Sequence, residues 1–329
     1  MSDNIKNELK LLPPSDDGIF KALMTRPDAE EVLKDLIGSI LGFNIIELRL
    51  IPNELPADVK DDKMERFDVA CKTDAGRLID VEMQAKPMRG DSFKTNHISI
   101  KKRSVYYVCD LHSTQPGEGI AYKLMSNTYQ IMICGFSIFE EDRKLVDKYT
   151  LRNEDGRELT DSISCIFVDL SFLTSLAKKN VSKMSPIEMW SVFLGGADNI
   201  QYRDKIDEIS SVRKEIGMAD ELLHTLSMDE NEWYHYRMRR KWKMDHDNDI
   251  IVATEEGRME ERKKAELEKA EIIKQAEAAK VEAEAAKEAV RQEEQRKVVS
   301  IQKLKTRKLS NEEIADILCV PLELVDQVS

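Results

Sequence analysis

The sequence predicts an α/β fold followed by a mostly helical C-terminal region. Apolar residues recur at helical spacing over residues 15–42, and strand-like runs rich in β-branched and aromatic residues follow at 44–51, 64–86, 128–139 and 144–170. One helical pattern, over residues 92–112, separates the second of these runs from the third. Helix, strands, helix and strands in that order indicate helices packed on a sheet.

The N-terminal helices carry recognisable start and stop signals. Two prolines precede Ser15, Asp16 and Asp17, which are candidate capping residues for a first helix. A second helical pattern runs from Asp28 to Gly42. We therefore expect two short helices before the first strand.

The C-terminal half is helical and highly charged. Residues 255–297 are almost entirely Glu, Lys, Arg, Gln and Ala, which favours a long solvated helix whose alanine seam makes only a weak coiled coil. Ser310 and Glu313 fit a capping box and Pro321 starts another helix, so the C-terminus resembles part of a helix-turn-helix. The expected segments are an α/β domain (1–184), a helical extension (185–254), a long charged helix (255–300) and a helical hairpin (301–329).

Composition narrows the class of protein. The chain has 329 residues, of which 41% are hydrophobic and 34% charged, and its longest apolar runs are too short to span a membrane. No secretory signal is visible, and the five cysteines form no CxxC pair, so we expect reduced thiols, no structural zinc and a cytoplasmic location. The net charge of −12 argues against broad nucleic-acid binding, but a local basic strip between Lys86 and Arg103 suits a site-limited contact with a polyanion.

The hairpin "MERFDVACKTDAGRLIDVEMQAK" places acidic residues among core residues. A three-residue loop at Asp74–Gly76 pairs Thr73 with Arg77, and counting outward from that pair puts Asp68 directly opposite Glu82. Two facing carboxylates repel, and a bound divalent cation reverses the sign of that interaction. Mg²⁺ takes one or two protein carboxylates, to which the backbone carbonyl of Met83 adds a ligand, and Gln84 on the same face could hold the attacking water. The alternative is a solvated sheet face on which Asp68 pairs with Arg66 or Lys72.

Three stretches carry a family resemblance. In order, "SDDGIFKALM", "ERFDVACKTDAGRLIDVEMQ" and "KKRSVYYVCDL" resemble the motifs of the Rpn (recombination-promoting nuclease) and transposase family of the PD-(D/E)XK superfamily. The resemblance runs from about Ser15 to Phe139. It implies a restriction-endonuclease-like core, with a mixed central sheet flanked by helices, within residues 1–184. In this sequence Gln84 stands where the superfamily pattern has Lys.

The resemblance implies a Mg²⁺- or Mn²⁺-dependent DNA endonuclease linked to recombination or mobile elements. Asp68 and Glu82 would carry the ion, while Gln84 would orient water without supplying charge, so slow or lost cleavage is one expectation. The family pattern D-x-x-F-K maps onto Asp17 and Lys21. Asp17 would reach the ion or its waters and Lys21 a phosphate, although helix capping explains Asp17 equally well.

The helical pattern at 92–112 adds cations beside tyrosines. Arg103 lies three and four residues before Tyr106 and Tyr107, so its guanidinium can sit beside an aromatic ring. In the resembled family this helix lies beside the active site, which makes Lys102, Arg103 and Tyr107 candidates for phosphate contacts. The alternative assigns the tyrosines to the core and the lysines to solvent, and we expect His97 to be a packing or surface residue.

Three functions remain open from the sequence. The leading one is the metal-dependent DNA endonuclease. The second is a decayed nuclease core that binds DNA or acts as a scaffold, and the third is an assembly protein whose charged helix carries the function. DNA is the expected partner, and a homodimer through the C-terminal helices would suit an enzyme that cuts both strands.

Overall fold

The computed structural model describes residues 10–51, 68–88, 92–115 and 121–328. The chain divides into two compact units, residues 1–241 and 242–329. None of the described helices combines the length and the apolar run that crossing a bilayer requires.

A six-stranded mixed sheet forms the centre of the first unit. Its strand order is β1-β2-β3-β4-β6-β5, with β3, β4 and β6 parallel and the other neighbours antiparallel. The strands are β1 (Leu48–Leu50), β2 (Val69–Thr73), β3 (Leu78–Gln84), β4 (Thr128–Cys134), β5 (Val146–Arg152) and β6 (Glu158–Asp169). The predicted α/β fold with a mixed central sheet is therefore confirmed.

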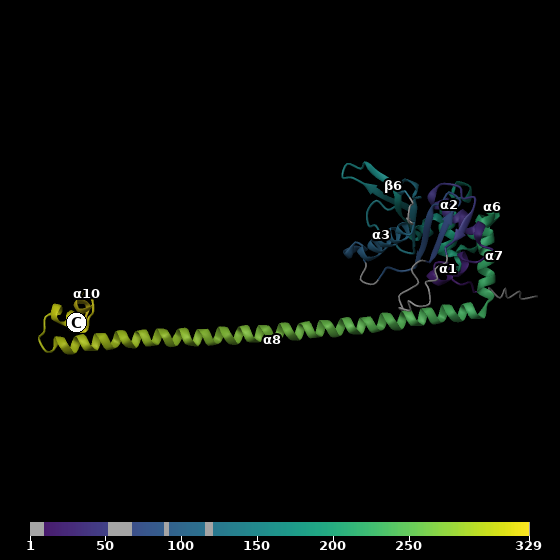
Figure 1. Cartoon of the computed structure of the whole chain (residues 1–329). Coiled ribbons are helices and arrows are strands. Elements are labelled where there is room, and N and C mark those ends of the chain that lie inside the picture. The colour runs from purple at the N-terminus through teal and green to yellow at the C-terminus, as the bar shows by residue number, and fades with distance from the viewer. Residues whose placement is uncertain (1–9, 52–67, 89–91, 116–120, 329) are drawn as a thin grey trace, which may run out of the picture. The chain divides into compact units, whose positions relative to one another are not determined.

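Helices cover both faces of this sheet (Figure 1). Helix α3 (Ile98–Ser113) packs on one face through Ile100, Val108 and Leu111. The other face carries the main core, to which α1 (Asp17–Met24), α2 (Glu30–Leu41), α5 (Pro186–Gly196), α6 (Arg203–Val212) and α7 (Lys214–Met228) contribute, with the short α4 (Leu173–Leu176) nearby. The site described below lies on the face covered by α3.

Local signals explain where the first helices begin and end. The Asp16 side chain accepts a hydrogen bond from the backbone N–H of Ile19 at 3.3 Å, so Asp16 caps α1. Gly42 has the left-handed conformation that closes α2, with φ of 76°. Helix α1 contacts β3 and buries Phe20, which holds Asp17 and Lys21 beside the sheet.

The hairpin of β2 and β3 has the predicted register. The Thr73 N–H donates to the Arg77 carbonyl at 3.0 Å, and Gly76 has a φ of 77°, the left-handed conformation that this three-residue loop requires. Ala70 pairs with Asp80, and the same register continued by two residues places Asp68 opposite Glu82.

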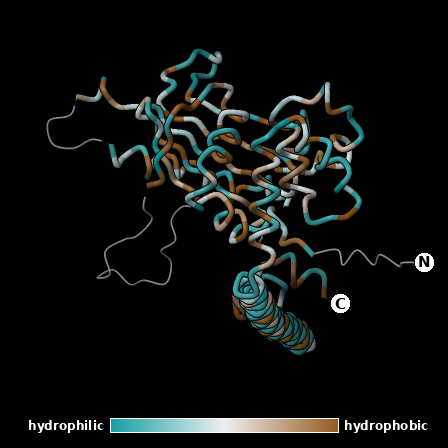
Figure 2. The backbone as a smooth tube through the Cα atoms, turned by 90° about the vertical axis from the view of Figure 1, so that its right-hand side faces the viewer, coloured by the Kyte–Doolittle hydropathy of each residue, from teal (hydrophilic) through white to brown (hydrophobic). Residues whose placement is uncertain are grey.

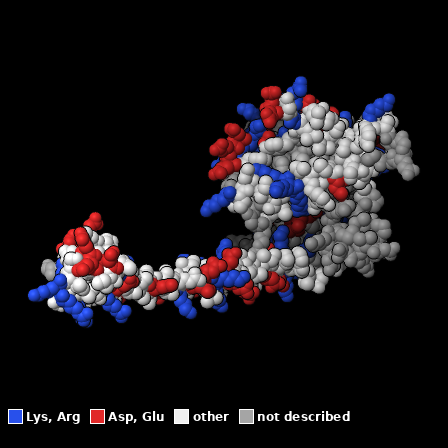
Figure 3. All heavy atoms as spheres, turned by 60° about the vertical axis from the view of Figure 1, so that its left-hand side comes forward, with Lys and Arg blue, Asp and Glu red and all other residues white. Residues whose placement is uncertain are grey.

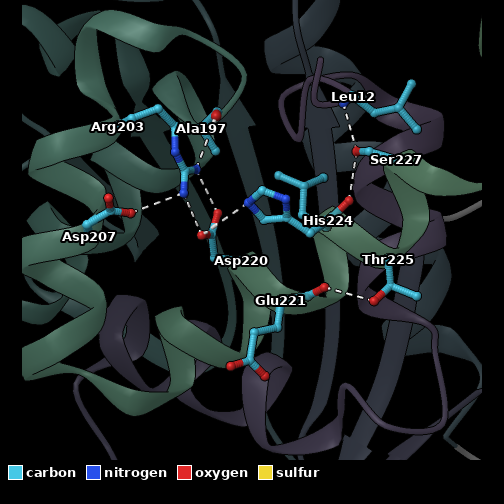
Figure 4. A network of polar contacts seen from close by, with 10 residues as sticks. Leu12, Ala197, Arg203, Asp207, Asp220, Glu221, His224, Thr225 and Ser227 are labelled. Carbon is cyan, nitrogen blue, oxygen red and sulfur yellow. Dashed lines mark hydrogen bonds and ion pairs between the residues drawn. The ribbon is translucent and has the colours of Figure 1, made fainter. Parts of the chain in front are cut away.

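A polar network joins α6 to α7 (Figure 4). The Arg203 guanidinium donates to both carboxylate oxygens of Asp220, at 2.8 and 2.7 Å, and also reaches Asp207 at 3.2 Å and the Ala197 carbonyl at 3.4 Å. His224 lies 3.8 Å from the same Asp220 carboxylate. Bidentate pairing of this kind adds directional specificity to the contact between the two helices.

The helix α8 (Glu230–Lys305) is a single element that starts well before the charged segment expected at residue 255. Its first residues belong to the first unit, where Trp233 and Tyr236 pack against the core. In the second unit its side chains are almost all exposed and its surface is mostly hydrophilic (Figure 2). Figure 3 shows cations and anions interspersed along this helix.

The end of the second unit is a small three-helix cluster. Ser310 and Glu313 form the predicted capping box of α9 (Asn311–Leu318), and α10 (Leu322–Gln327) follows Pro321. Ile301 at the end of α8 packs with Ile314 and Val325. The last turns of α8 thus provide a third helix for the predicted hairpin.

Candidate active site

Asp68 and Glu82 lie side by side across the ends of β2 and β3. The backbone N–H of Asp68 donates to Glu82 Oε1 at 2.9 Å, and the backbone N–H of Met83 donates to Asp68 Oδ2 at 3.0 Å. Each carboxyl group is therefore held by the backbone of the opposite strand. Glu82 is only 2% exposed, so this pair is far less hydrated than two carboxylates on an open sheet face.

Arg103 of α3 reaches into the pair from above the sheet. Its Nη2 donates to Glu82 Oε2 at 2.6 Å, and its Nη1 donates to Gln84 Oε1 at 3.3 Å. The guanidinium carbon lies 4.9 Å from the centre of the Tyr107 ring, one helical turn along. The expected position of Arg103 beside a tyrosine ring is observed for Tyr107, whereas Tyr106 is 58% exposed.

Gln84 is engaged by protein at both ends of its amide. Its Nε2 donates to the Lys86 carbonyl at 2.8 Å, while its Oε1 accepts from Arg103. The side chain lies at the end of β3 and on the same face as Glu82, as the alternation along the strand predicts. The second N–H of Nε2 and the second lone pair of Oε1 remain for a water molecule, because a side-chain amide has two donors and two acceptor positions.

Helix α1 contributes two charged residues to the surroundings of the pair. The carboxylate of Asp17 accepts from the Gly18 N–H at 3.1 Å, and its negative charge contributes to raising the pKa of Asp68. Lys21, one turn further on, lowers the pKa of both Asp68 and Glu82 by its positive charge. Lys102 is exposed on α3, and among the described residues it makes no ion pair with either carboxyl group.

Burial changes the ionisation of both carboxyl groups. The pKa of Asp68 is raised to about 6, mainly by desolvation and further by the negative charge of Asp17. The positive charges of Arg103 and Lys21 partly oppose this increase. The pKa of Glu82 is raised to about 8, mainly by desolvation and secondly by the negative charge of Asp68. Arg103 and Lys21 therefore do not supply enough positive charge for both groups to be ionised at neutral pH.

Asp80 is a buried acidic residue to which the sequence assigned no role. It is fully buried opposite Ala70 and Gln130, and desolvation, followed by the charge of Glu82, raises its pKa well above the usual value. Its carboxyl oxygens have no hydrogen-bond partner of good geometry, although the nearby Gln130 amide lowers the pKa somewhat. The alternation along β3 places Asp80 and Glu82 on one face, but α3 covers that face, which the sequence pattern alone does not reveal.

Lys72 does not pair with Asp68. Lys72 is exposed and lies opposite Leu78 in the sheet, while the Asp68 carboxylate is bonded to the Met83 backbone. Arg66, the other partner considered for Asp68, lies outside the described residues. The structure therefore does not show the alternative in which Asp68 pairs with Lys72 on a solvated sheet face.

The remaining residues between Lys86 and Arg103 are described only in part. Arg89 and Asp91 lie outside the described residues. His97 is buried against the Phe136 ring, with ring centres 5.4 Å apart, which agrees with a packing role.

The donor set suits a hard divalent cation. In the described ranges no group of three or more His, Cys, Asp or Glu side chains has the spacing of a metal cage. Mg²⁺ does not require one, because it binds through one or two carboxylates and keeps waters or substrate oxygens in its other positions. Half-buried Asp68 and buried Glu82, both with raised pKa values, fit that preference, since a bound cation would favour the ionised form of both carboxyl groups.

A mixed sheet flanked by helices, with an Asp and a Glu paired at the ends of two strands, is the arrangement of a PD-(D/E)XK nuclease core. The chain matches the family model "PD-(D/E)XK nuclease family transposase" over residues 14–253 and belongs to that family. Comparisons with curated proteins and with solved structures find no match. The family match includes all six strands of the sheet, the helices α1 to α7 and the first part of α8.

Proposed function

We propose that this protein is a divalent-metal-dependent DNA endonuclease that hydrolyses phosphodiester bonds. The observation that carries the proposal is the pair of half-buried Asp68 and buried Glu82, each bonded to the backbone of the other's strand and each with a raised pKa. A family of nucleases and transposases makes DNA the natural substrate and mobile-element or recombination biology the natural setting. Mg²⁺ is the expected ion and Mn²⁺ its substitute.

Each residue has a role that follows from its position. Asp68, Glu82 and the backbone carbonyl of Met83 would hold the ion, which when bound would activate water and neutralise charge on the phosphate. The Gln84 amide, with Asp17 nearby, would orient the attacking water. Arg103 already bridges Glu82 and Gln84, so its guanidinium can donate a hydrogen bond to a phosphate oxygen without a large movement.

Further contacts to the DNA backbone are assigned to surrounding cations. Lys21 on α1 and Lys102 on α3 would neutralise flanking phosphates, and the Tyr107 ring would hold the Arg103 guanidinium in place. A homodimer through the C-terminal helices would bring two such sites to one duplex.

A second candidate function is a decayed nuclease core that binds DNA or acts as a scaffold. The observation that favours it is the Gln84 amide, which has no charge and is bonded at both ends to Arg103 and to the Lys86 backbone. In that case the carboxyl pair would still bind an ion, but water would not be activated fast enough for cleavage.

Nicking of supercoiled plasmid in Mg²⁺ and in Mn²⁺ tests the proposal. We expect cleavage by the wild-type protein and a loss of about 10³-fold or more in Asp68→Ala and in Glu82→Ala, because each removes a ligand of the ion. Lys72→Ala, on the exposed part of β2, is the matched control and should cut normally. Binding without cleavage in either metal would favour the second candidate, and cleavage that survives in both variants would refute the first.

A further inference from the structure

The beginning of α8 carries an unbalanced run of cations. Between residues 237 and 241 the sequence is "RMRRK", with four cations and no acidic residue. Among the described residues, none of Arg237, Arg239, Arg240 and Lys241 makes an ion pair or a side-chain hydrogen bond to another residue of the chain. Like charges three and four positions apart on a helix repel each other, so this run is destabilising unless an anion binds to it.

The rest of α8 does not share this feature. Further along, Glu and Lys alternate, and pairs such as Glu293 and Lys297, 2.8 Å apart, balance their charges. The family match ends at residue 253, so the cationic run falls in the part of α8 that belongs with the nuclease unit. The run is therefore a local feature of that unit and not a property of the charged helix as a whole.

Arg239 lies directly against helix α1. A β-carbon placed on Gly18 would collide with the Arg239 guanidinium, so the absence of a side chain at Gly18 makes room for it. Gly18 is next to Asp17 and three residues before Lys21, both of which act electrostatically on the Asp68 carboxyl group. The cationic run is thus joined, through Arg239 at its middle, to the edge of the candidate active site.

Arg237 and Arg240 continue the positive charge around α8. With Lys10 they line a surface pocket whose other walls include the rings of Trp233 and Tyr236. The amine of Lys10 lies 5.7 Å from the centre of the Trp233 ring, and the two rings are 5.8 Å apart in an edge-to-face arrangement. Cations interleaved with aromatic rings are the chemistry that binds a nucleic-acid backbone and its bases.

We propose that Arg237, Arg239 and Arg240 form a phosphate-binding track that leads substrate DNA from the active site, past Gly18, onto the start of α8. This inference rests on the proposed nuclease function but concerns binding, which can be measured without cleavage. The ligand chemistry is a run of phosphodiester groups. Duplex and single-stranded DNA both supply it, and the exposed Tyr234 ring on the same segment would favour the single strand by stacking.

The test measures binding of the full-length chain to fluorescein-labelled DNA by anisotropy in EDTA, where no divalent ion supports cleavage. The triple variant Arg237→Ala, Arg239→Ala and Arg240→Ala should bind about tenfold or more weakly than the wild type. Its plot of log affinity against log salt should be less steep by about 3 for a duplex, roughly one for each phosphate that the variant no longer neutralises. Running duplex and single strand in parallel distinguishes the two sources.

Two further variants make the test specific. Arg258→Ala, Arg262→Ala and Lys263→Ala remove the same number of exposed cations from the balanced part of α8 and should leave affinity and salt dependence unchanged. Gly18→Ala should displace the Arg239 guanidinium and weaken binding about threefold, while the helix itself is at least as stable because alanine favours helices. Circular dichroism of each variant checks that the fold is intact.

The outcomes separate this inference from the proposed function. Weakened binding in the triple variant supports the track even if the wild type cuts no plasmid. An unchanged affinity and slope, or an equal loss in the control variant, overturns the track even if the wild type is an efficient nuclease. DNA binding that is unchanged while self-association of the chain is lost would assign the segment to an acidic protein surface and also overturn it.

Discussion

Two charged clusters of the first unit differ in how their charge is balanced. Between α6 and α7, Arg203 is bonded in a bidentate manner to Asp220, and Asp207 and His224 lie around that pair. Around the neighbouring ends of β2 and β3 lie three carboxyl groups (Asp68, Asp80 and Glu82), of which only Glu82 is bonded to Arg103, while the charge of Lys21 lowers the pKa of Asp68 and of Glu82. We call the first cluster balanced because its most buried carboxylate, Asp220, has a bidentate bond to Arg203. We call the second cluster unbalanced because Arg103 donates to only one of its three carboxyl groups.

This difference teaches how to separate a structural network from a binding site. Both clusters contain part-buried Arg–carboxylate bonds of 2.6 to 2.8 Å, so distance alone does not distinguish them. What distinguishes them is the raised pKa of the carboxyl groups in the second cluster, which means that the protein alone does not stabilise their charged forms. Removing a charge should therefore have opposite effects on the stability of the metal-free protein in the two places.

The largest expected effect is in the balanced cluster. Arg203→Ala leaves Asp220, whose side chain is only 13% exposed, without its main partner, which should lower the free energy of unfolding by about 3 kcal/mol. Urea unfolding followed by tryptophan fluorescence, to which the buried Trp190 contributes, measures it. Arg152→Ala removes an exposed pair with Glu158 and should cost less than about 1 kcal/mol. Equal losses in the two variants would contradict the contrast.

In the unbalanced cluster, Asp68→Asn should stabilise the metal-free protein at pH 8. The folded pKa of about 6 lies above the ordinary aspartate value of 3.8, so the folded state binds the proton more tightly than the unfolded chain does. That contribution is fully present below about pH 4 and is lost as the pH rises through about 6, so wild-type stability in EDTA should fall over this range. The amide cannot ionise and should retain about 2 kcal/mol more stability at pH 8.

Added Mg²⁺ provides the control for this prediction. It should recover stability in the wild type at pH 8, do so less at pH 5, where protons compete for the same oxygens, and have little effect on Asp68→Asn. A wild-type protein whose metal-free stability rises between pH 4 and pH 8, or an Asp68→Asn variant that is less stable than wild type at pH 8, would show that the pair is already compensated.

The sequence predicted which residues of the unbalanced cluster face each other, but it did not predict how deeply the cluster is buried. The loop at Asp74–Gly76 sets the hairpin register by local chemistry, and the facing positions of Asp68 and Glu82 follow from it. The full burial of Asp80 could not be predicted, because it depends on α3 lying over a strand face whose alternation reads as polar. Local sequence patterns predict strand register and helix capping, whereas packing between distant segments determines which polar residues are buried.

Contacts between segments that are far apart in the chain could not be predicted from the sequence either. Gly18 reads as an ordinary residue in the first turn of α1, and its contact with Arg239 requires α8 to pass beside α1. The start of α8 at Glu230 was missed because Trp233 and Tyr236 belong to the core and interrupt the charged composition that marks the rest of the helix. The highly charged composition after residue 255 therefore marks the exposed part of α8 and does not mark where the helix begins.

The smallest expected effect comes from adding charge to the unbalanced cluster. Gln84→Lys places an ammonium group two residues past Glu82 on the same face of β3, where it adds the cation that this sequence lacks relative to the superfamily pattern. It should increase the rate of plasmid nicking about fivefold, equivalent to roughly 1 kcal/mol in the barrier, because a positive charge stabilises the phosphate in the transition state. Gln84→Met, which removes the bonds to Arg103 and Lys86 without adding charge, should be slower than wild type. If Gln84→Lys is no faster than the wild type while Gln84→Met is slower, the amide acts by holding Arg103 in place, and the missing charge is supplied by Arg103 itself.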